Sequence, residues 1–199
     1  MREKPSRRDL LLSSALAATG LGLGLADALA QQTLTPTPSC DENGAATEAQ
    51  TEGPFFKPRS PERIDLRESG AGARTVELSG QVLTRACKPV ARALVDLWHA
   101  DEKGNYDERG NRYRGHVFAD NEGRYRFLTI MPALYPGRTR HYHVKVQAPN
   151  RPVLTTQLYF PADEQANRRD GLFRRELLMQ VTQASEALSA RFTFVLDIG

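Results

Sequence analysis

The chain has 199 residues, of which 27 are basic and 24 acidic, and 40% are hydrophobic. Once the four basic and three acidic residues of the first thirty are set aside, 23 basic and 21 acidic side chains remain. This near-neutral balance predicts no nucleic-acid partner, because such partners require a surplus of positive charge. The 169 residues after position 30 suffice for one domain with its own core and are too few for two.

The first thirty residues have the pattern of an export signal. Basic residues that include the adjacent Arg7 and Arg8 precede an apolar run, and an Ala-Leu-Ala sequence at 28–30 ends the segment. The paired arginines favour the twin-arginine route over an ordinary secretory signal, with cleavage after Ala30. The segment is too short for a full membrane span. We therefore expect a periplasmic or secreted protein without a stable membrane anchor.

Residues 31–50 are expected to form a flexible or wrapping arm in front of a domain at 51–199. They are rich in Thr, Pro, Gly, Asn and acidic side chains and show no apolar periodicity. Cys40 in the arm and Cys87 in the domain are the two cysteines of the chain. In an oxidising compartment they can pair and attach the arm to the domain, and two unpaired thiols are the alternative.

Short strands follow along the domain. Six runs rich in Val, Leu, Thr, Phe and Tyr are separated by Gly, Pro and Asn. They span residues 75–84, 93–99, 124–129, 141–148, 153–159 and 191–197. Several short strands at this spacing predict an all-β fold, a sandwich or a barrel. One or two helical turns are expected between residues 170 and 180.

Two histidines and two tyrosines form a candidate metal site. In HYHVKVQ, strand alternation places His141 and His143 on one face, so that two ring nitrogens can converge on one cation. Tyr135 precedes them across a Pro-Gly turn, and Tyr106 ends the loop WHADEKGNY. A phenol is a poor ligand until a strongly charged cation ionises it. The tyrosines therefore favour ferric iron, Fe(3+), over zinc.

With these pieces assembled, the chain resembles the intradiol ring-cleavage dioxygenases. The sequence blocks that carry the resemblance are TEGPFF, LSGQVLTRACKPVARALVDLWHADEKGNYD, RGHVFADNEGRYRFLTIMPALYPGR, HYHVKV and TTQLYFPAD, in this order between residues 51 and 163. The resemblance implies a β-sandwich with ferric iron at one edge, often assembled into homo-oligomers. It also implies an enzyme that cleaves an aromatic ortho-diol between its two hydroxyl-bearing carbons, with dioxygen as the second substrate.

The same resemblance implies a role for each site residue. Tyr106 looks like the ligand that stays on iron throughout the cycle, and Tyr135 like the ligand that substrate displaces. The two histidines look like neutral nitrogen ligands. Arg138 matches an arginine that supports negative charge developing on the substrate ring, and Gln157 matches a glutamine that lines the same pocket. The chain departs from the pattern at Phe55 and its neighbour Phe56, where tyrosine is common, which leaves the substrate open.

Two other functions stay open on the sequence. One is a non-catalytic periplasmic binding module, because a fold does not determine a function. The other is a hydrolase that holds a divalent metal with the two histidines, which leaves both tyrosines unexplained. A colourless protein without iron favours the binding module, and activity without dioxygen favours the hydrolase.

Several other aromatic and imidazole side chains are interpreted as structural. His99 and His116 share no strand with another metal-binding residue type, so we expect them to be structural or exposed. Trp98 is expected in the core with the aromatic residues of the 124–129 run. Tyr113 either approaches the pocket from the loop after Tyr106 or lies on the surface.

Overall fold

The computed structural model describes residues 44–70, 72–184 and 186–199, all within the compact unit Pro36–Gly199. The export signal and Cys40 lie outside the described residues. Among the described residues no cysteine is free. Both the export route and the pairing of Cys40 with Cys87 stay predictions.

The described residues form short strands with very little helix. In chain order the elements are β1 (Thr75–Thr84), β2 (Leu94–Trp98), β3 (Arg114–Phe118), β4 (Arg124–Ile130), β5 (His141–Gln147), β6 (Val153–Tyr159), α1 (Glu164–Arg169), a 3-10 turn (Arg175–Leu177), β7 (Gln180–Gln183), β8 (Leu188–Arg191) and β9 (Phe194–Leu196). Within the described part of the chain, no helix has the length and apolar character that a membrane span needs.

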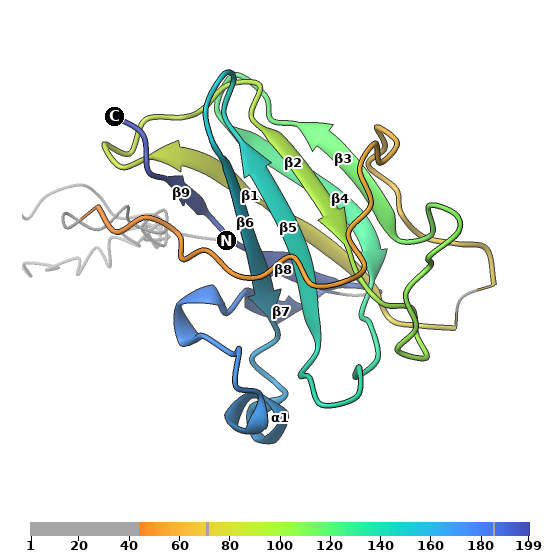
Figure 1. Ribbon diagram of the computed structural model, residues 1–199. Helices are drawn as coiled ribbons and strands as arrows, with labels where there is room; N and C mark the ends of the chain where they lie inside the picture. Colours follow the sequence, from red (N-terminus) through yellow and green to blue (C-terminus); the bar gives the residue numbers. More distant parts are fainter. Residues whose placement is uncertain (1–43, 71, 185) are drawn as a thin grey trace, which may run out of the picture. The chain divides into compact units, whose positions relative to one another are not determined.

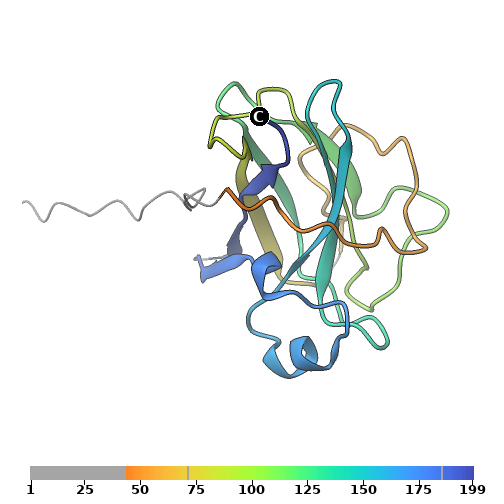
Figure 2. The ribbon, with the colours of Figure 1, turned by 60° about the vertical axis from the view of Figure 1, so that its left-hand side comes forward.

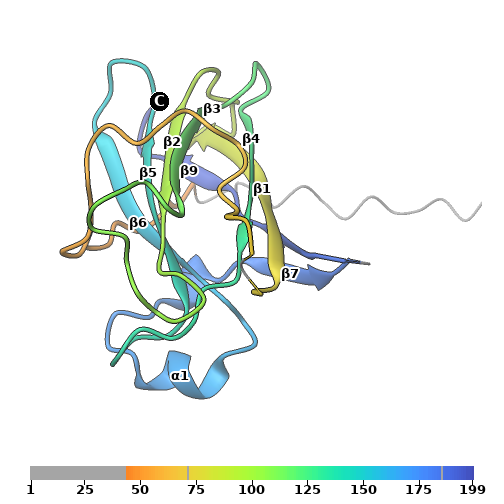
Figure 3. The ribbon, with the colours of Figure 1, turned by 90° about the vertical axis from the view of Figure 1, so that its right-hand side faces the viewer.

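The strands make two sheets that pack as the layers of a sandwich (Figure 1). One sheet has the order β4-β1-β8-β7, with β9 also paired to β1, and the other has the order β3-β2-β5-β6. Figures 2 and 3 show the two layers edge-on. Strands β8 and β9 both run parallel to β1, whereas the pairs in the four-stranded sheet are all antiparallel. The predicted all-β sandwich is therefore confirmed.

Alternation along β5 divides its side chains between the core and the outer face of its sheet. Tyr142, Val144 and Val146 are completely buried and belong to the apolar core between the layers. The Tyr142 hydroxyl donates to the carbonyl of Ile130 at 2.8 Å, which satisfies its polar end inside the core. The histidines of this strand consequently point away from the core, as the period of two requires.

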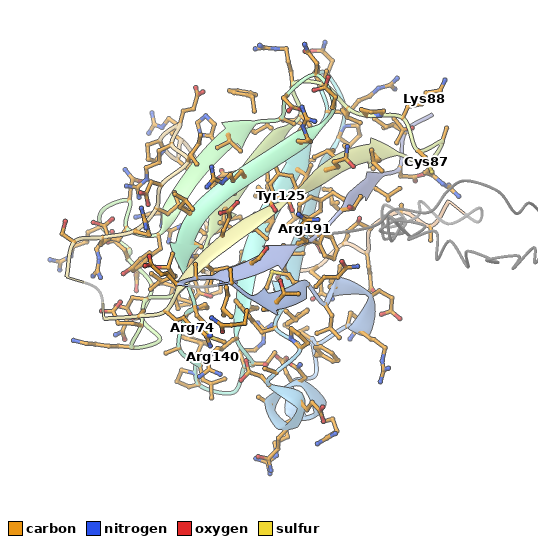
Figure 4. The ribbon with its side chains drawn as sticks, turned by 180° about the vertical axis from the view of Figure 1, so that it is seen from behind. Arg74, Cys87, Lys88, Tyr125, Arg140 and Arg191 are labelled. Atoms are coloured by element: carbon orange, nitrogen blue, oxygen red, sulfur yellow. The ribbon has the colours of Figure 1, made fainter. Side chains whose placement is uncertain are left out.

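The five-stranded sheet contributes its own aromatic layer. Tyr125 and Phe127 of β4 are both buried, as their predicted common face requires. The Tyr125 hydroxyl donates to the carbonyl of Phe192 at 2.9 Å, beside β8 (Figure 4). At Gly80 a Cβ atom would lie 1.7 Å from the same carbonyl oxygen, so only glycine allows β1 to pass so close to this segment.

The structure contains strands that were not predicted. Strands β3 and β7 have no predicted counterpart, since the sequence RGHVF of β3 holds a glycine and few apolar residues and the sequence QVTQ of β7 holds a single apolar residue. The run expected at 191–197 is divided between β8 and β9, which pair with different parts of β1. Between 170 and 180 the 3-10 turn supplies the one helical turn that was expected, and the six-residue helix α1, which was not expected, lies before this segment.

The segment that precedes β1 covers the outer face of the four-stranded sheet. It runs across β6 and β5 in Figure 1. The amide of Gln50 donates to the carbonyl of Thr155 at 2.8 Å, and the Gln157 side chain donates to the carbonyl of Thr51 at 2.9 Å. Residues 44–56, the covering segment from here on, thereby shield the face to which the β5 histidines point.

Candidate metal centre

Three of the four predicted donor atoms converge on the outer face of the four-stranded sheet. The Tyr106 hydroxyl oxygen lies 3.3 Å from His141 Nε2 and 3.1 Å from His143 Nε2. The two Nε2 atoms are 3.1 Å apart. This compact triangle joins a loop after β2 to the start of β5, which are 35 residues apart in the chain.

The two histidines are held as neutral imidazoles. Both are nearly inaccessible to solvent, and burial lowers the pKa of His141 to about 4 and that of His143 well below its usual value. His141 Nδ1 lies 2.6 Å from the carbonyl of Thr139, which requires a proton on Nδ1 and leaves the lone pair on Nε2. A neutral ring with its free lone pair turned to a shared point is the form in which histidine binds a metal.

Tyr106 is positioned by a tight loop built on Asp101. The Asp101 carboxylate accepts the backbone N–H groups of Lys103 and Asn105, each at 2.8 Å. Phe55 of the covering segment stacks on the Tyr106 ring, with centroids 4.3 Å apart and planes 9° from parallel. The ring is thus clamped between its own loop and the covering segment.

Tyr135 lies beside this triangle without joining it. Its ring centroid is 5.8 Å from that of Tyr106 in an edge-on arrangement, and 5.7 Å from that of Phe55. The residue is half-buried, and its neighbours Pro136 and Gly137 are exposed. In the part of the chain that the structure describes, no hydrogen bond joins the Tyr135 hydroxyl to the other three donors. The Tyr135 and Tyr106 phenols are therefore close enough to bind one cation together.

The covering segment forms the roof of the centre. Gly53 has a φ of +68°, and a Cβ there would lie 3.3 Å from Cε1 of His143, so a larger residue would be strained and crowded. Phe56 packs on Trp98 with centroids 5.0 Å apart, and Trp98 stacks on His143 at the same distance. Trp98 is buried, as expected for a core residue, and its ring also contacts Phe56 and His143 on the site face of the sheet.

Arg138 and Gln157 lie together at the side of the centre. An Nη2 hydrogen of Arg138 is donated to Gln157 Oε1 at 2.6 Å. Gln157 is directly opposite His143 in the pairing of β6 with β5, and it is completely buried. Arg138 Nε also donates to Asp170, a residue that sequence reasoning missed. Asp170 follows α1, more than thirty residues from Arg138, and no local pattern marks it.

The donor set fits a small, highly charged cation. Bonds of about 2 Å to one cation place neighbouring ligand atoms about 3 Å apart, which is the spacing of the triangle. When both rings carry their proton on Nδ1, the two Nε2 lone pairs face each other and repel, and a cation between them removes that repulsion. Burial raises the pKa of the Tyr106 phenol above its usual value, so ionisation of Tyr106 needs such a charge nearby.

A metal site of another type is not evident. Within residues 44–70, 72–184 and 186–199, no group of three or more His, Cys, Asp or Glu is placed to hold a metal ion. A site made of two histidines and a carboxylate, as ferrous iron prefers, is therefore not found among the described residues. The oxygen atom that stands beside both imidazoles is that of the Tyr106 phenol.

The remaining predicted side chains lie away from the centre. His99 is completely buried between Thr129 and the carbonyl of Ala100, and His116 contacts Ser60, so both are structural as expected. Tyr113 is buried as well and donates to Glu102 at 3.1 Å. The surface position considered for Tyr113 was wrong, and Tyr113 lines a cavity together with Tyr106.

The known proteins that this chain resembles are dioxygenases. The family model described as Dioxygenase matches residues 51–198. A hydroxyquinol 1,2-dioxygenase of Rhodococcus opacus is 32% identical over 153 residues, which cover 64% of this chain and 51% of that protein. The protocatechuate 3,4-dioxygenase beta chain of Burkholderia cepacia is 32% identical over 156 residues, 63% of this chain and 65% of that one. This chain spans about half to two thirds of these curated relatives.

One solved structure matches this chain over the whole length of the solved protein. It is the dioxygenase domain of a dioxygenase and carbohydrate-binding protein fusion from the cellulolytic bacterium Streptomyces sp. SirexAA-E, with 50% sequence identity and a TM-score of 0.75. The match covers 78% of this chain and 100% of that one. A 3-chlorocatechol 1,2-dioxygenase of Rhodococcus opacus 1CP is 26% identical, with a TM-score of 0.69 over 76% of this chain and 72% of that one.

Proposed function

We propose, because this chain belongs to the intradiol dioxygenase family, that it cleaves an aromatic ortho-diol between its two hydroxyl-bearing carbons and adds both atoms of dioxygen. The observation that carries the proposal is the convergence of Tyr106, His141 and His143, with the Tyr135 ring beside them. Two phenols and two imidazoles on one sheet face have no evident use in a module that only binds.

Ferric iron is the cation that we propose for this centre. Tyr106, Tyr135, His141 and His143 would hold it, and the phenols account for the preference for a trivalent ion. When bound, iron supplies a Lewis acid that favours loss of both protons from a diol. A divalent-metal hydrolase remains less favoured, because it gives neither tyrosine a role.

The side chains of the site divide the remaining work. Tyr135 is suited to leave when the diol arrives, and its phenolate oxygen can accept a proton from a diol hydroxyl. Its half-buried position on an exposed turn permits that movement. Tyr106, stacked under Phe55, is suited to stay. Arg138 supplies a positive charge beside the substrate ring, where negative charge develops. Gln157 would line the same pocket.

The covering segment gives the substrate pocket an apolar wall. Phe55 and Phe56 present aromatic rings over the centre, one on Tyr106 and the other on Trp98. A flat aromatic ring packs well on such a wall and displaces water from the reacting atoms. We propose a catechol-type diol as the substrate class, in line with relatives named for hydroxyquinol and chlorocatechol.

The test is isotopic. Purified, iron-loaded protein is incubated with catechol, hydroxyquinol or protocatechuate under labelled dioxygen, and the products are analysed by mass spectrometry. We expect a ring-opened dicarboxylate that carries two labelled oxygen atoms, and a coloured protein with about one iron per chain. Cleavage beside the hydroxyls contradicts the proposal. A colourless protein that binds diols without consuming dioxygen supports the binding module instead.

We further propose that the protein is exported in folded form through the twin-arginine route, on the sequence of residues 1–30 alone. Replacement of Arg7 and Arg8 by lysine should leave uncleaved protein inside the cell, as detected by fractionation. A fusion with an ordinary secretory signal serves as the control for processing. Normal export of the lysine variant contradicts this route.

A further inference from the structure

A buried carboxylate outside the blocks of family resemblance holds Arg138. Asp170 follows α1 directly, and its side chain is 1% exposed. Its two oxygens lie 3.0 and 2.8 Å from Arg138 Nε. The same oxygens accept the backbone N–H groups of Thr139 at 3.0 Å and Leu172 at 2.9 Å. The carboxylate is therefore fully used, and it joins the loop before β5 to the segment after α1.

The guanidinium of Arg138 is fixed along two edges. Asp170 takes the Nε hydrogen, and Gln157 takes one of the Nη2 hydrogens at 2.6 Å. Gln157 is itself held, since it donates to the carbonyl of Thr51 and accepts from the Tyr159 hydroxyl. The Tyr159 hydroxyl, 3.1 Å from Gln157 Oε1, also interacts with the Arg138 guanidinium. Asp170, Gln157 and Tyr159 together hold this charge beside the candidate metal centre.

The Arg138 charge acts on the donors of the metal centre. Burial is the largest cause of the shifted pKa values of Tyr106, His141 and His143, and the Arg138 charge contributes to each of them. A largely buried guanidinium needs a counter-charge, and Asp170 supplies it. An arginine without this anchor keeps its rotamer freedom and must be ordered when substrate binds.

We propose that Asp170 is a positioning residue: it orients the Arg138 guanidinium toward the candidate metal centre, where the guanidinium charge can stabilise the negative charge of a bound diol. This inference rests on the proposed function for the role of Arg138. The tether itself stands on the hydrogen bonds alone. Asp170 acts through Arg138 and has no assigned contact with substrate or metal.

Asp170→Asn is the informative variant, because asparagine keeps an oxygen that can accept from a backbone amide and removes the charge that pairs with Arg138. The chain also offers a matched control. Arg140 pairs with Asp163 at the other end of α1, two residues along the same loop (Figure 4 labels Arg140). Asp163→Asn removes a partly buried ion pair of the same kind that has no contact with the centre.

A double-mutant cycle decides whether Asp170 works through Arg138. In iron-loaded protein, Asp170→Asn should lower kcat/KM by about 10- to 100-fold, as loss of an outer supporting partner does. In the Arg138→Gln background the same change should cost less than about threefold, because there is no guanidinium left to position. Asp170→Glu should restore part of the activity, and Asp163→Asn should stay within about threefold of wild type. Equal losses from Asp170→Asn in both backgrounds overturn the proposal.

A second measurement does not depend on activity. In metal-free protein labelled with nitrogen-15, the Arg138 Nε–H signal should exchange slowly with solvent, and Asp170→Asn should make its exchange fast. Asp163→Asn should leave that signal unchanged. Fast exchange in the wild type, or slow exchange in Asp170→Asn, contradicts the tether. If the tether is present and no labelled dioxygen is incorporated, the proposed function fails and the positional role of Asp170 is limited to structure.

Discussion

Tyr106 and Tyr135 reach the centre from two loops that are held with different firmness. The Tyr106 loop closes on the buried Asp101, whose carboxylate accepts two backbone amides, and Phe55 covers the Tyr106 ring. The Tyr135 loop ends in an exposed Pro-Gly turn, and the preceding Leu134 is 47% exposed. The two loops touch where the amide of Ala133 donates to the carbonyl of Asp101 at 3.0 Å.

The difference between the loops assigns the two phenols different chemical roles. A ligand that must stay on the metal benefits from a rigid support, because a preorganised donor loses little entropy on binding. A ligand that must leave needs a loop that can move without breaking buried hydrogen bonds. Tyr106 meets the first requirement and Tyr135 the second, so the firmness of each loop can be tested through iron retention and turnover.

Loss of the Tyr106 phenol should have the largest effect on iron binding. We expect Tyr106→Phe to lose most of its iron or to shift the visible charge-transfer band strongly, and His141→Ala to empty the centre. Tyr135→Phe should retain most of its iron with an altered band, because its ligand is the one that leaves. Metal analysis and visible spectra of the purified variants measure both. Full iron content with unchanged spectra in the Tyr106 and His141 variants refutes the ligand assignment.

Arg138→Ala should separate metal binding from turnover. Iron content and colour should stay close to wild type, because Arg138 contributes no donor atom to the cation. Turnover should fall by about 10²- to 10³-fold, the range for removal of one preorganised donor that stabilises charge in the transition state. Steady-state kinetics beside metal analysis gives both quantities. Turnover that survives the loss of Arg138 removes the role that we assign to it, whatever the iron content.

Low pH should lower the free energy of unfolding through a buried histidine next to the Tyr106 loop. His99 lies at its base, and burial lowers the pKa of this imidazole from 6.5 to about 4. As the pH falls below 6.5, His99 becomes protonated in the unfolded chain and stays largely neutral in the folded protein. The free energy of unfolding therefore decreases, by about 3 kcal/mol at pH 4. Urea unfolding of the metal-free protein between pH 7 and 4 should show a shallower pH dependence in His99→Gln. An equal pH dependence of the unfolding free energy in wild type and in His99→Gln contradicts this role of His99.

Residue spacing was sufficient to predict the shared face of His141 and His143, because the alternation of a strand is a property of the backbone. The tyrosines and their turns suggested that Tyr106 shares a site with these histidines, and the family resemblance gave each ligand its role. The resemblance also drew attention to Phe55. Asp170 could not be found in either way, since it reaches the site from a segment without periodicity and distant in the chain. Burial of Trp98 was predicted, but its contact with His143 was not, because an aromatic residue in an apolar strand fits either face when both faces are buried.

Asp101→Ala should have the smallest effect on activity and the most direct bearing on the Tyr106 loop. The variant leaves two partly buried hydrogen bonds without their acceptor, which should lower the free energy of unfolding by about 2 kcal/mol. Iron should also be lost faster to a chelator, since Tyr106 loses its rigid support. Asp120 accepts the amides of Glu122 and Arg124 with the same spacing along the chain, in an exposed turn far from the site.

Asp120→Ala is therefore the matched control for the loop. Water can replace the lost acceptor in an exposed turn, so this variant should be less destabilised and should lose iron at the wild-type rate. Urea unfolding of the metal-free proteins and the rate of iron transfer to a chelator give the two comparisons. If both variants release iron equally fast, the Asp101 turn does not support the ligand. If only Asp101→Ala releases iron faster, the firmness of the Tyr106 loop contributes to metal retention as well as to folding.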